Sequence, residues 1–328
     1  MAISFIDSIR ALSAKRGEGQ KQAWRELGGL YRQPGIRVSF EFFPPKTIEA
    51  EQNLWPAAQK LASLQPGFMT VTYGAGGSTR AKTQFTAKAI QDLTGIPMAA
   101  HLTCVAASKG EVNTVADALW QDGIRHLIAL RGDMPGGGAY VPHADGYQYT
   151  SDLVAGLKRL HNFEISVAAY PEKHPDAPDL NTDLQALKRK LDAGADRAIT
   201  QFFFEPATYM RFLEQARAIG ITQPIVPGIL PINSFSQVQK FAAQCGARIP
   251  DSIAENFAGL DDDAEVRKLI AAVTAAEQCQ VLAGMGVRHF HFYTLNRADL
   301  VYAVCHLLGL RPKAKELEAP IPATSAIK

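Results

Sequence analysis

The chain lacks a strong charge of either sign, and it also lacks a long uninterrupted apolar run. Its 328 residues carry 34 Lys and Arg against 32 Asp and Glu, a formal net charge of +2, and the basic residues are dispersed. Because this balance creates no strong field toward nucleic acid or an anionic membrane, we expect neither as a partner. No uncharged apolar stretch reaches about 18 residues, so the sequence predicts no membrane span.

Cysteine is scarce. The four cysteines are far apart and form no CxxC motif: Cys104, Cys245, Cys279 and Cys305. Such spacing is typical of free thiols in a reducing compartment and does not fit a disulfide framework or a zinc site. The first residues, MAISFIDSIRALSAKR, lack the features of a secretory leader, and their apolar residues recur at helical spacing. We therefore expect a cytoplasmic protein with an extra N-terminal helix.

Eight short apolar segments recur along the chain and predict strands. Most are nearly continuous in hydrophobicity, as expected of strands buried on both faces of a parallel sheet. They are Arg37–Phe42, Phe68–Tyr73, Met98–Thr103, His126–Leu130, Glu164–Ala169, Ala198–Phe203, Ile225–Ile229 and His289–Tyr293. Helical periodicity is clearest between them at Leu54–Leu64, Ala81–Leu93, Val112–Trp120, Leu184–Leu191 and Tyr209–Ile219.

This alternation predicts an α/β fold, and specifically a (β/α)8 TIM barrel. Strand starts recur every 27 to 38 residues until a last gap of 64, which holds extra helical segments around Ile253–Phe257 and Ala264–Ala276. The rival is a doubly wound sheet, which usually has a Gly-rich turn after the first strand, whereas Phe42-Phe43-Pro44-Pro45 follows here. We expect a helical extension at residues 1–35, a catalytic barrel at 36–311 and a flexible tail at 312–328.

Polar side chains stand at the predicted strand ends, which is where barrel enzymes place their chemistry. Glu41 lies among Phe40, Phe42 and Phe43. Burial there would raise the pKa of its carboxyl group, as a proton donor near neutral pH requires. The same carboxylate could instead pair with a buried Arg or Lys, so these residues alone leave its role open.

The sequence also lacks the two common phosphate-binding motifs, GxGxxG and a Gly-Lys-Ser/Thr loop. A bound nucleotide would therefore be held by the barrel mouth. The segment Gly74–Thr79 precedes a predicted helix and could cradle a phosphate or simply be a loop. His289 and His291 share one face of the last predicted strand and could bind a divalent metal. The carboxylates that would complete a metal site are not apparent, so we interpret both histidines as structural and expect no metal.

Several segments together resemble the methylenetetrahydrofolate reductase family. Between Ile36 and Leu310 they are, in order, SFEFFPPKT, VTYGAGG, AHLTC, ALRGD, AAYPEKHP, LKRKLDAGADRAITQFFF, PGILPI and HFYTLNR. The length resembles the bacterial form, which is a catalytic barrel alone. The resemblance implies bound FAD, NADH or NADPH as electron donor, and a homodimer or homotetramer. It also implies reduction of 5,10-methylenetetrahydrofolate to 5-methyltetrahydrofolate, a step of one-carbon metabolism that feeds methionine biosynthesis.

The resemblance further implies roles for individual residues. Glu41 matches the general acid that protonates folate N10, and Asp133 matches the aspartate between flavin and folate. Hydride would pass from nicotinamide through flavin N5 to the folate methylene carbon. Implied FAD contacts are Thr72, His101, Arg131, Gly132, Asp133, Thr150, Tyr170, His174, Asp183 and Lys190. Implied substrate contacts are Gln201, Gln237, Phe241, Tyr293, Leu295 and Arg297.

Three other functions remain open on the sequence alone. A flavin-dependent barrel acting on another reduced pterin or an amine would share the cofactor but not the substrate. A metal-dependent barrel hydrolase would use His289 and His291. A non-catalytic folate- or flavin-binding protein would not need both Glu41 and Gln201. The choice between NADH and NADPH is also open, because there is no Rossmann motif whose acidic or basic residue could be inspected.

Overall fold

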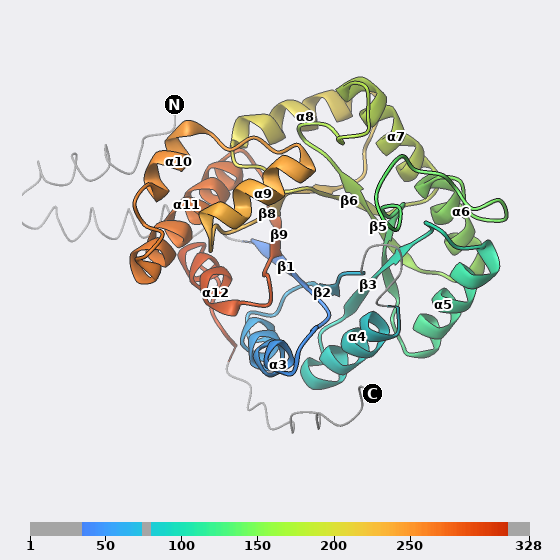
Figure 1. Ribbon diagram of the computed structural model, residues 1–328, viewed down its shortest axis with the longest axis horizontal. Helices are drawn as coiled ribbons and strands as arrows, with labels where there is room; N and C mark the ends of the chain where they lie inside the picture. The colour runs from blue at the N-terminus through green and yellow to red at the C-terminus, as the bar shows by residue number, and fades with distance from the viewer. Residues whose placement is uncertain (1–34, 74–79, 314–328) are drawn as a thin grey trace, which may run out of the picture.

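A ring of parallel strands surrounded by helices forms the protein, as the computed structural model in Figure 1 shows. The structure describes residues 35–73 and 80–313. The predicted (β/α)8 barrel is confirmed. The predicted N-terminal helix, the segment Gly74–Thr79 and nearly all of the predicted C-terminal tail lie outside the described residues.

The strands follow the predicted segments closely, with β2 and β6 ending earlier than expected. They are β1 (Arg37–Phe42), β2 (Phe68–Val71), β3 (Met98–Thr103), β4 (His126–Leu130), β5 (Glu164–Ala169), β6 (Arg197–Thr200), β7 (Ile225–Val226), β8 (Gly228–Ile229) and β9 (His289–Tyr293). Their side chains are almost all buried, because one face of each strand meets the barrel interior and the other meets the helices.

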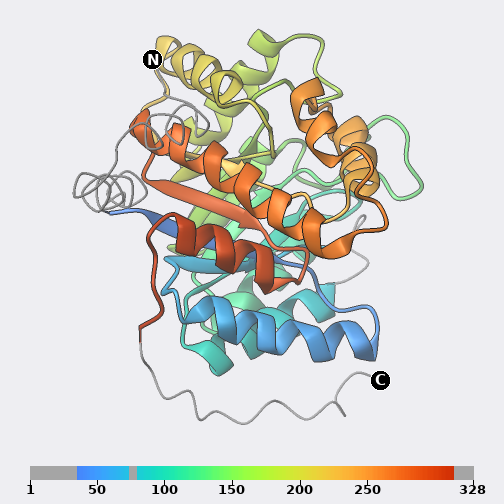
Figure 2. The same ribbon diagram turned by 90° about the vertical axis from the view of Figure 1, so that its left-hand side faces the viewer.

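Helices connect successive strands and cover the outside of the barrel. They are α3 (Ile48–Ala62), α4 (Arg80–Thr94), α5 (Lys109–Gln121), α6 (Thr150–Leu160), α7 (Leu180–Asp192), α8 (Pro206–Ala218), α9 (Phe235–Cys245), α10 (Asp251–Phe257), α11 (Ala264–Gly284) and α12 (Ala298–Leu307). Figure 2 shows α11, α12 and α3 side by side on one flank. Among the described helices, none is long and apolar enough to cross a membrane.

The sequence predicted a single strand at Ile225–Ile229. The structure divides this segment at Pro227 into two short strands, and together they close the barrel. The first half, β7, pairs with β6, and the second half, β8, pairs with β9. Proline has no N–H to donate, so the ladder is interrupted there. Gly228 N–H instead donates to Thr200 Oγ1 at 2.9 Å. A Cβ atom on Gly228 would lie 2.2 Å from the Thr200 carbonyl oxygen, so this close approach requires glycine.

The barrel interior contains a ring of histidines near the amino ends of the strands. The Phe68 ring lies at the centre, with ring centroids 4.5 Å from His126 and 6.0 Å from both His289 and His291. Burial, followed by the charges of His291, Arg37 and Arg197, lowers the pKa of His289 to about 3. This histidine is therefore neutral in the folded protein at ordinary pH.

The neutral state of His289 predicts a loss of stability in mild acid. The unfolded chain binds this proton near the ordinary pKa of about 6.5, whereas the folded protein binds it only near pH 3. Protonation therefore favours the unfolded state as the pH falls through that window. Between pH 7 and pH 5, we expect His289→Gln to lose about 2 kcal/mol less of its free energy of unfolding than the wild type.

Chemical denaturation at the two pH values measures this difference. His143→Gln is the matched control, because His143 is exposed in the loop before α6. Equal losses in His289→Gln and the wild type would contradict the burial argument.

Candidate active site

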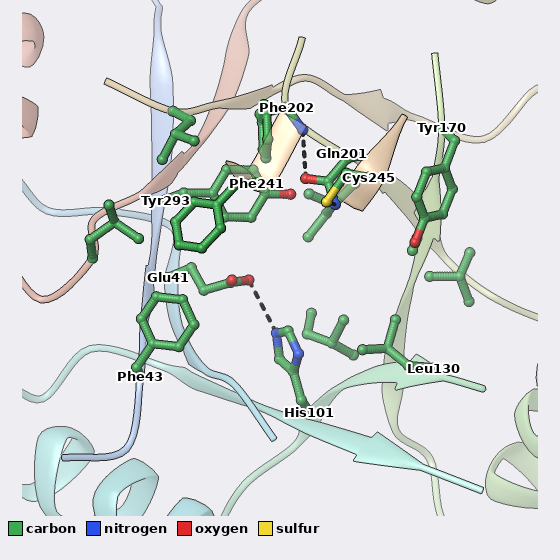
Figure 3. A pocket seen from close by; sticks show the side chains of 16 residues that line it. Glu41, Phe43, His101, Leu130, Tyr170, Gln201, Phe202, Phe241, Cys245 and Tyr293 are labelled. Carbon is green, nitrogen blue, oxygen red and sulfur yellow. Dashed lines mark hydrogen bonds and ion pairs between the residues drawn. The ribbon is translucent and has the colours of Figure 1, made fainter. Parts of the chain in front are cut away.

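A cavity of about 280 Å³ lies at the carboxyl ends of the strands (Figure 3). Strand β1 contributes Glu41 and β3 contributes His101, while Tyr293 comes from the end of β9. Apolar side chains form most of the wall, and Phe241 covers the cavity from α9. The cavity therefore places a few polar groups in a largely apolar space, as small-molecule sites do.

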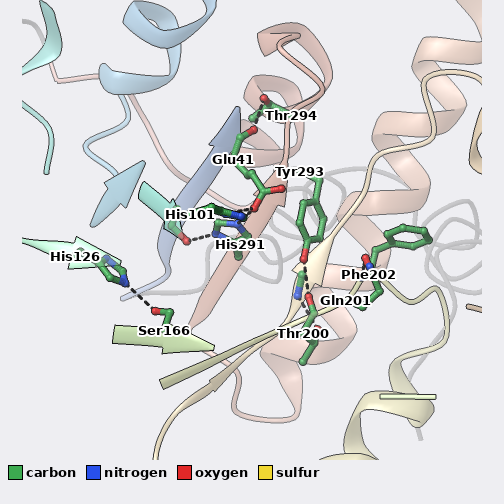
Figure 4. A network of polar contacts seen from close by, with 12 residues as sticks. Glu41, His101, His126, Ser166, Thr200, Gln201, Phe202, His291, Tyr293 and Thr294 are labelled. Atoms are coloured by element: carbon green, nitrogen blue, oxygen red, sulfur yellow. Dashed lines mark hydrogen bonds and ion pairs between the residues drawn. The ribbon is translucent and has the colours of Figure 1, made fainter. Parts of the chain in front are cut away.

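Glu41 is held in the cavity by the pairing of the first and last long strands. It lies in register with Tyr293 on β9, and its carbonyl oxygen accepts hydrogen bonds from both the N–H and the hydroxyl of Thr294. Its Oε2 lies 3.2 Å from His101 Nε2 and 3.4 Å from His291 Nε2 (Figure 4). One carboxylate oxygen is thus shared between two imidazoles.

The sequence predicted a raised pKa for Glu41, and that prediction is wrong. Burial does favour the neutral carboxyl group, but the attraction of His101 in its protonated form and the hydrogen bonds from His101 and His291 outweigh it and lower the pKa to about 2. The partners were not foreseen, because His291 is 250 positions away in the chain. Glu41 is therefore an ionised carboxylate at neutral pH.

Gln201 and Tyr293 are fixed in the cavity wall by hydrogen bonds. Gln201 accepts a hydrogen bond from the Phe202 N–H at 2.9 Å and donates its amide N–H to Cys245 Sγ at 3.2 Å. Tyr293 donates its hydroxyl to the Thr200 carbonyl at 2.7 Å. Burial, and then the charge of Glu41, raise the pKa of Tyr293, so it stays neutral. Both side chains present fixed polar edges to whatever fills the cavity.

A second hollow of about 480 Å³ adjoins the cavity over the loops after β4 and β5. We name it the cationic groove; Arg131, Thr150, His174, Asp183 and Lys190 line it. The two spaces meet where the rings of Tyr170 and His174 pack 4.6 Å apart. Helix α6 begins at Thr150, and the Tyr149 N–H just before it donates to Asp152 Oδ2 at 3.1 Å. Three cationic side chains, Arg131, Arg189 and Lys190, together with the nearby N-terminus of α6 favour an anion such as a phosphate.

Arg131 and Lys190 are anchored by hydrogen bonds. Arg131 donates to Asp176 Oδ2 at 2.7 Å, and Lys190 donates to the Ala168 carbonyl at 2.5 Å. Burial lowers the pKa of Lys190 to about 8. A phosphate entering the groove would raise the pKa of Lys190 again, because a nearby anion stabilises the protonated form.

Gly132 shapes the turn between the cavity and the groove. It adopts φ +84°, and a Cβ atom there would lie 2.5 Å from Val105 Cγ1 and 3.0 Å from Thr103 Cβ. The next residue, Asp133, is exposed and lines neither space. Its charge nevertheless adds to burial in raising the pKa of Cys245, so it acts on the cavity from the mouth.

The predicted site residues fall into three groups. The cavity is lined by Glu41, His101, Tyr170, Gln201, Phe241, Tyr293 and Leu295. The cationic groove is lined by Arg131, Thr150, His174, Asp183 and Lys190. The structure does not bring the remaining residues into either lining: Thr72 and Gly132 are partly buried beside the mouth, and Asp133, Gln237 and Arg297 are exposed.

Two features of the site were missed in the sequence. The first is Cys245, which lies four residues after the expected contact Phe241 and on the same face of α9, over the cavity. Helix α9 was not among the helices predicted from periodicity. The spacing from Phe241 was the available signal for Cys245. The contact of His291 with Glu41 was also missed. The alternation His289-x-His291 predicted a shared face, but it could not identify the residue opposite.

The metal-site alternative finds no support in these contacts. Ser39 Oγ lies 2.8 Å from His291 Nδ1 and 3.2 Å from His289 Nε2. Within residues 35–73 and 80–313, no group of three or more His, Cys, Asp or Glu side chains is arranged to hold a metal ion. The two histidines therefore have hydrogen-bond partners inside the barrel.

The fold and the site together define a (β/α)8-barrel protein with a carboxylate–histidine cavity at its mouth and a cationic groove beside it. The chain matches the methylenetetrahydrofolate reductase family over residues 29–309. It belongs to that family.

Individual relatives agree with this assignment. The chain is 52% identical over 277 residues to the 5,10-methylenetetrahydrofolate reductase of Escherichia coli K12, covering 84% of this chain and 92% of the relative. It is 48% identical over 299 residues to the Salmonella typhimurium protein of the same name, covering 91% and 98%. A Clostridium thermocellum protein, described as binding two copies of 5-methyl-5,6,7,8-tetrahydrofolic acid, has a TM-score of 0.56 at 14% identity, covering 86% and 97%. That likeness shows the fold alone.

The turn at Gly132 generates a direct test of this geometry. We expect Gly132→Ala to lower the free energy of unfolding by about 1 to 3 kcal/mol more than Gly136→Ala. Both glycines have positive φ, but nothing lies within 4 Å of a Cβ atom on Gly136. Thermal and urea unfolding measure the difference. If the two variants are equally stable, the contact with Val105 does not constrain the turn.

Proposed function

We propose that this chain reduces 5,10-methylenetetrahydrofolate to 5-methyltetrahydrofolate in the cytoplasm, with bound FAD and with NADH or NADPH as electron donor. This places it in one-carbon metabolism, where the product supplies methyl groups for methionine biosynthesis. The observation that carries the proposal is the carboxylate of Glu41, held between two histidines in an apolar cavity. Membership of the methylenetetrahydrofolate reductase family supports it.

The residues of the two adjoining spaces fit FAD. The cationic groove offers Arg131, Lys190 and the N-terminus of α6 to a pyrophosphate. The cavity offers apolar walls to a flat ring. Thr103 Oγ1, at the end of β3, is buried without a hydrogen-bond partner among the described residues and could meet the polar edge of such a ring. When bound, FAD would supply hydride transfer between nicotinamide and folate through its N5 atom.

Glu41 would supply the proton. Reduction of the methylene bridge consumes one hydride and one proton, and the proton is needed at N10 to open the five-membered ring. When substrate displaces water from the cavity, the ion pair between Glu41 and a histidine becomes costly relative to the neutral pair. Substrate binding would thus shift the proton onto Glu41, from which the folate can accept it.

Other cavity residues would position the substrate. Gln201 has one amide oxygen and one amide hydrogen already engaged, so its remaining hydrogen-bonding capacity faces the cavity in a fixed orientation. A pterin ring has a matching donor and acceptor edge. Phe241 and Leu295 offer apolar surfaces against which the ring can stack. Asp133, at the mouth, would attract the cationic folate that forms after ring opening.

The variant Glu41→Gln tests the proposal. We expect reduction of the bound flavin by NADH to stay within about 2-fold of the wild type. Folate reduction should slow by roughly 10²- to 10⁴-fold, because the general acid is lost. Anaerobic stopped-flow absorbance separates the two half-reactions.

Glu51→Gln is the matched control, because Glu51 has the same exposed fraction, 8%, but lies on α3, and it lines neither the cavity nor the cationic groove. It should leave both half-reactions near wild-type rates. Normal folate turnover in Glu41→Gln would remove Glu41 from the role of acid.

A further inference from the structure

A line of hydrogen-bonding side chains runs through the barrel interior and ends at Glu41. His289 Nε2 lies 3.2 Å from Ser39 Oγ, Ser39 Oγ lies 2.8 Å from His291 Nδ1, and His291 Nε2 lies 3.4 Å from Glu41 Oε2. The four residues alternate on two paired strands: Ser39 is in register with His291, and each side chain points inward. The line is therefore set by strand register.

The Ser39 hydroxyl stands between two imidazole nitrogens and has only one hydrogen. It can donate to one nitrogen and must accept from the other, so one nitrogen carries a proton and the other a lone pair. His291 has no exposed surface and Ser39 has none, so water cannot substitute for either partner. The protonation of His291 Nδ1 is thereby coupled to the protonation of His289 Nε2.

The carboxylate of Glu41 selects one of the two arrangements. It is an acceptor, so His291 must present Nε2–H toward it. A neutral His291 then has its lone pair on Nδ1, which accepts from the Ser39 hydroxyl. His289 must in turn carry its proton on Nε2 and donate to Ser39. The pKa of His289, about 3, is consistent with a neutral ring that carries one proton. The line of hydrogen bonds places that proton on Nε2.

We propose that Ser39 and His289 are positioning residues for the proton donor, holding His291 in the tautomer whose Nε2–H faces Glu41. This rests on the proposed function, in which Glu41 protonates the folate. Neither residue touches the cavity, and both act through His291. Without the Ser39 hydroxyl, His291 can carry its proton on Nδ1 and turn a lone pair toward the carboxylate, which disfavours the ionised form of Glu41.

Other charged and titratable groups surround the line and must stay unchanged in any test. They are Arg37 on β1, His101 on β3, His126 on β4, Arg197 on β6 and Tyr293 on β9. The barrel also contains a matched pair that does not reach Glu41. Ser166 Oγ lies 2.8 Å from His126 Nε2, and both residues are as deeply buried as Ser39 and His291 (Figure 4).

The test compares Ser39→Ala with Ser166→Ala. Each removes one buried hydroxyl that contacts a buried imidazole, but only the first breaks the line to Glu41. We expect Ser39→Ala to shift the pH profile of folate reduction to higher pH, because the ionised form of Glu41 is disfavoured. Flavin reduction by NADH should not change. Ser166→Ala should keep the wild-type profile, and Ser39→Thr, which retains a hydroxyl, should restore the wild-type profile.

A spectroscopic readout keeps the proposal falsifiable if a variant folds poorly. In ¹⁵N-histidine NMR of the wild-type protein, we expect His291 and His289 both to be protonated on Nε2, with the His291 signal changing tautomer in Ser39→Ala. A His291 proton on Nδ1 in the wild type would overturn the proposal, as would identical pH profiles in Ser39→Ala and Ser166→Ala. If Glu41→Gln also reduces folate normally, the proposed function fails; if only the serine comparison fails, the function stands without the positioning line.

Discussion

The pairing of β1 with β9 is the interaction on which the site depends. It brings together residues about 250 positions apart, so that Ser39 meets His291 and Glu41 lies beside Tyr293. The register matters as much as the contact, because a shift of one residue would turn Glu41 away from the interior. The division of the preceding strand at Pro227 allows β8 to complete this side of the ring. The strand pairing that closes the barrel therefore also brings the site residues together.

The site combines two adjoining spaces that differ in polarity. The cavity is mostly apolar and holds one carboxylate between imidazoles, whereas the groove beside it is cationic and open to a helix N-terminus. Gly132 lets the chain turn tightly between them. A dinucleotide cofactor needs both environments at once, since its ring and its phosphates differ in polarity. The barrel supplies them from neighbouring strand ends, without a Rossmann turn.

Much of this architecture could be predicted from the sequence, because strands buried on both faces leave continuous apolar segments. Five strands, including β1 and β9, have the predicted bounds. Polar residues at those strand ends, such as Glu41 and His101, were correctly placed at one cavity. The sign of the Glu41 pKa shift was wrong, because it depends on partners from distant strands. Local sequence reports burial, whereas the balance of burial against charge is decided only after the barrel closes.

The most direct measurement is an anaerobic absorbance spectrum of the purified protein, recorded alone, after NADH and then after methylenetetrahydrofolate. A flavin spectrum that NADH bleaches and the folate restores is the predicted result, since it requires both the cofactor and the substrate to use this barrel mouth. Bleaching without restoration by the folate would contradict the proposed substrate. A colourless protein that also fails to take up added FAD would contradict the assignment of the cavity and the cationic groove to a flavin.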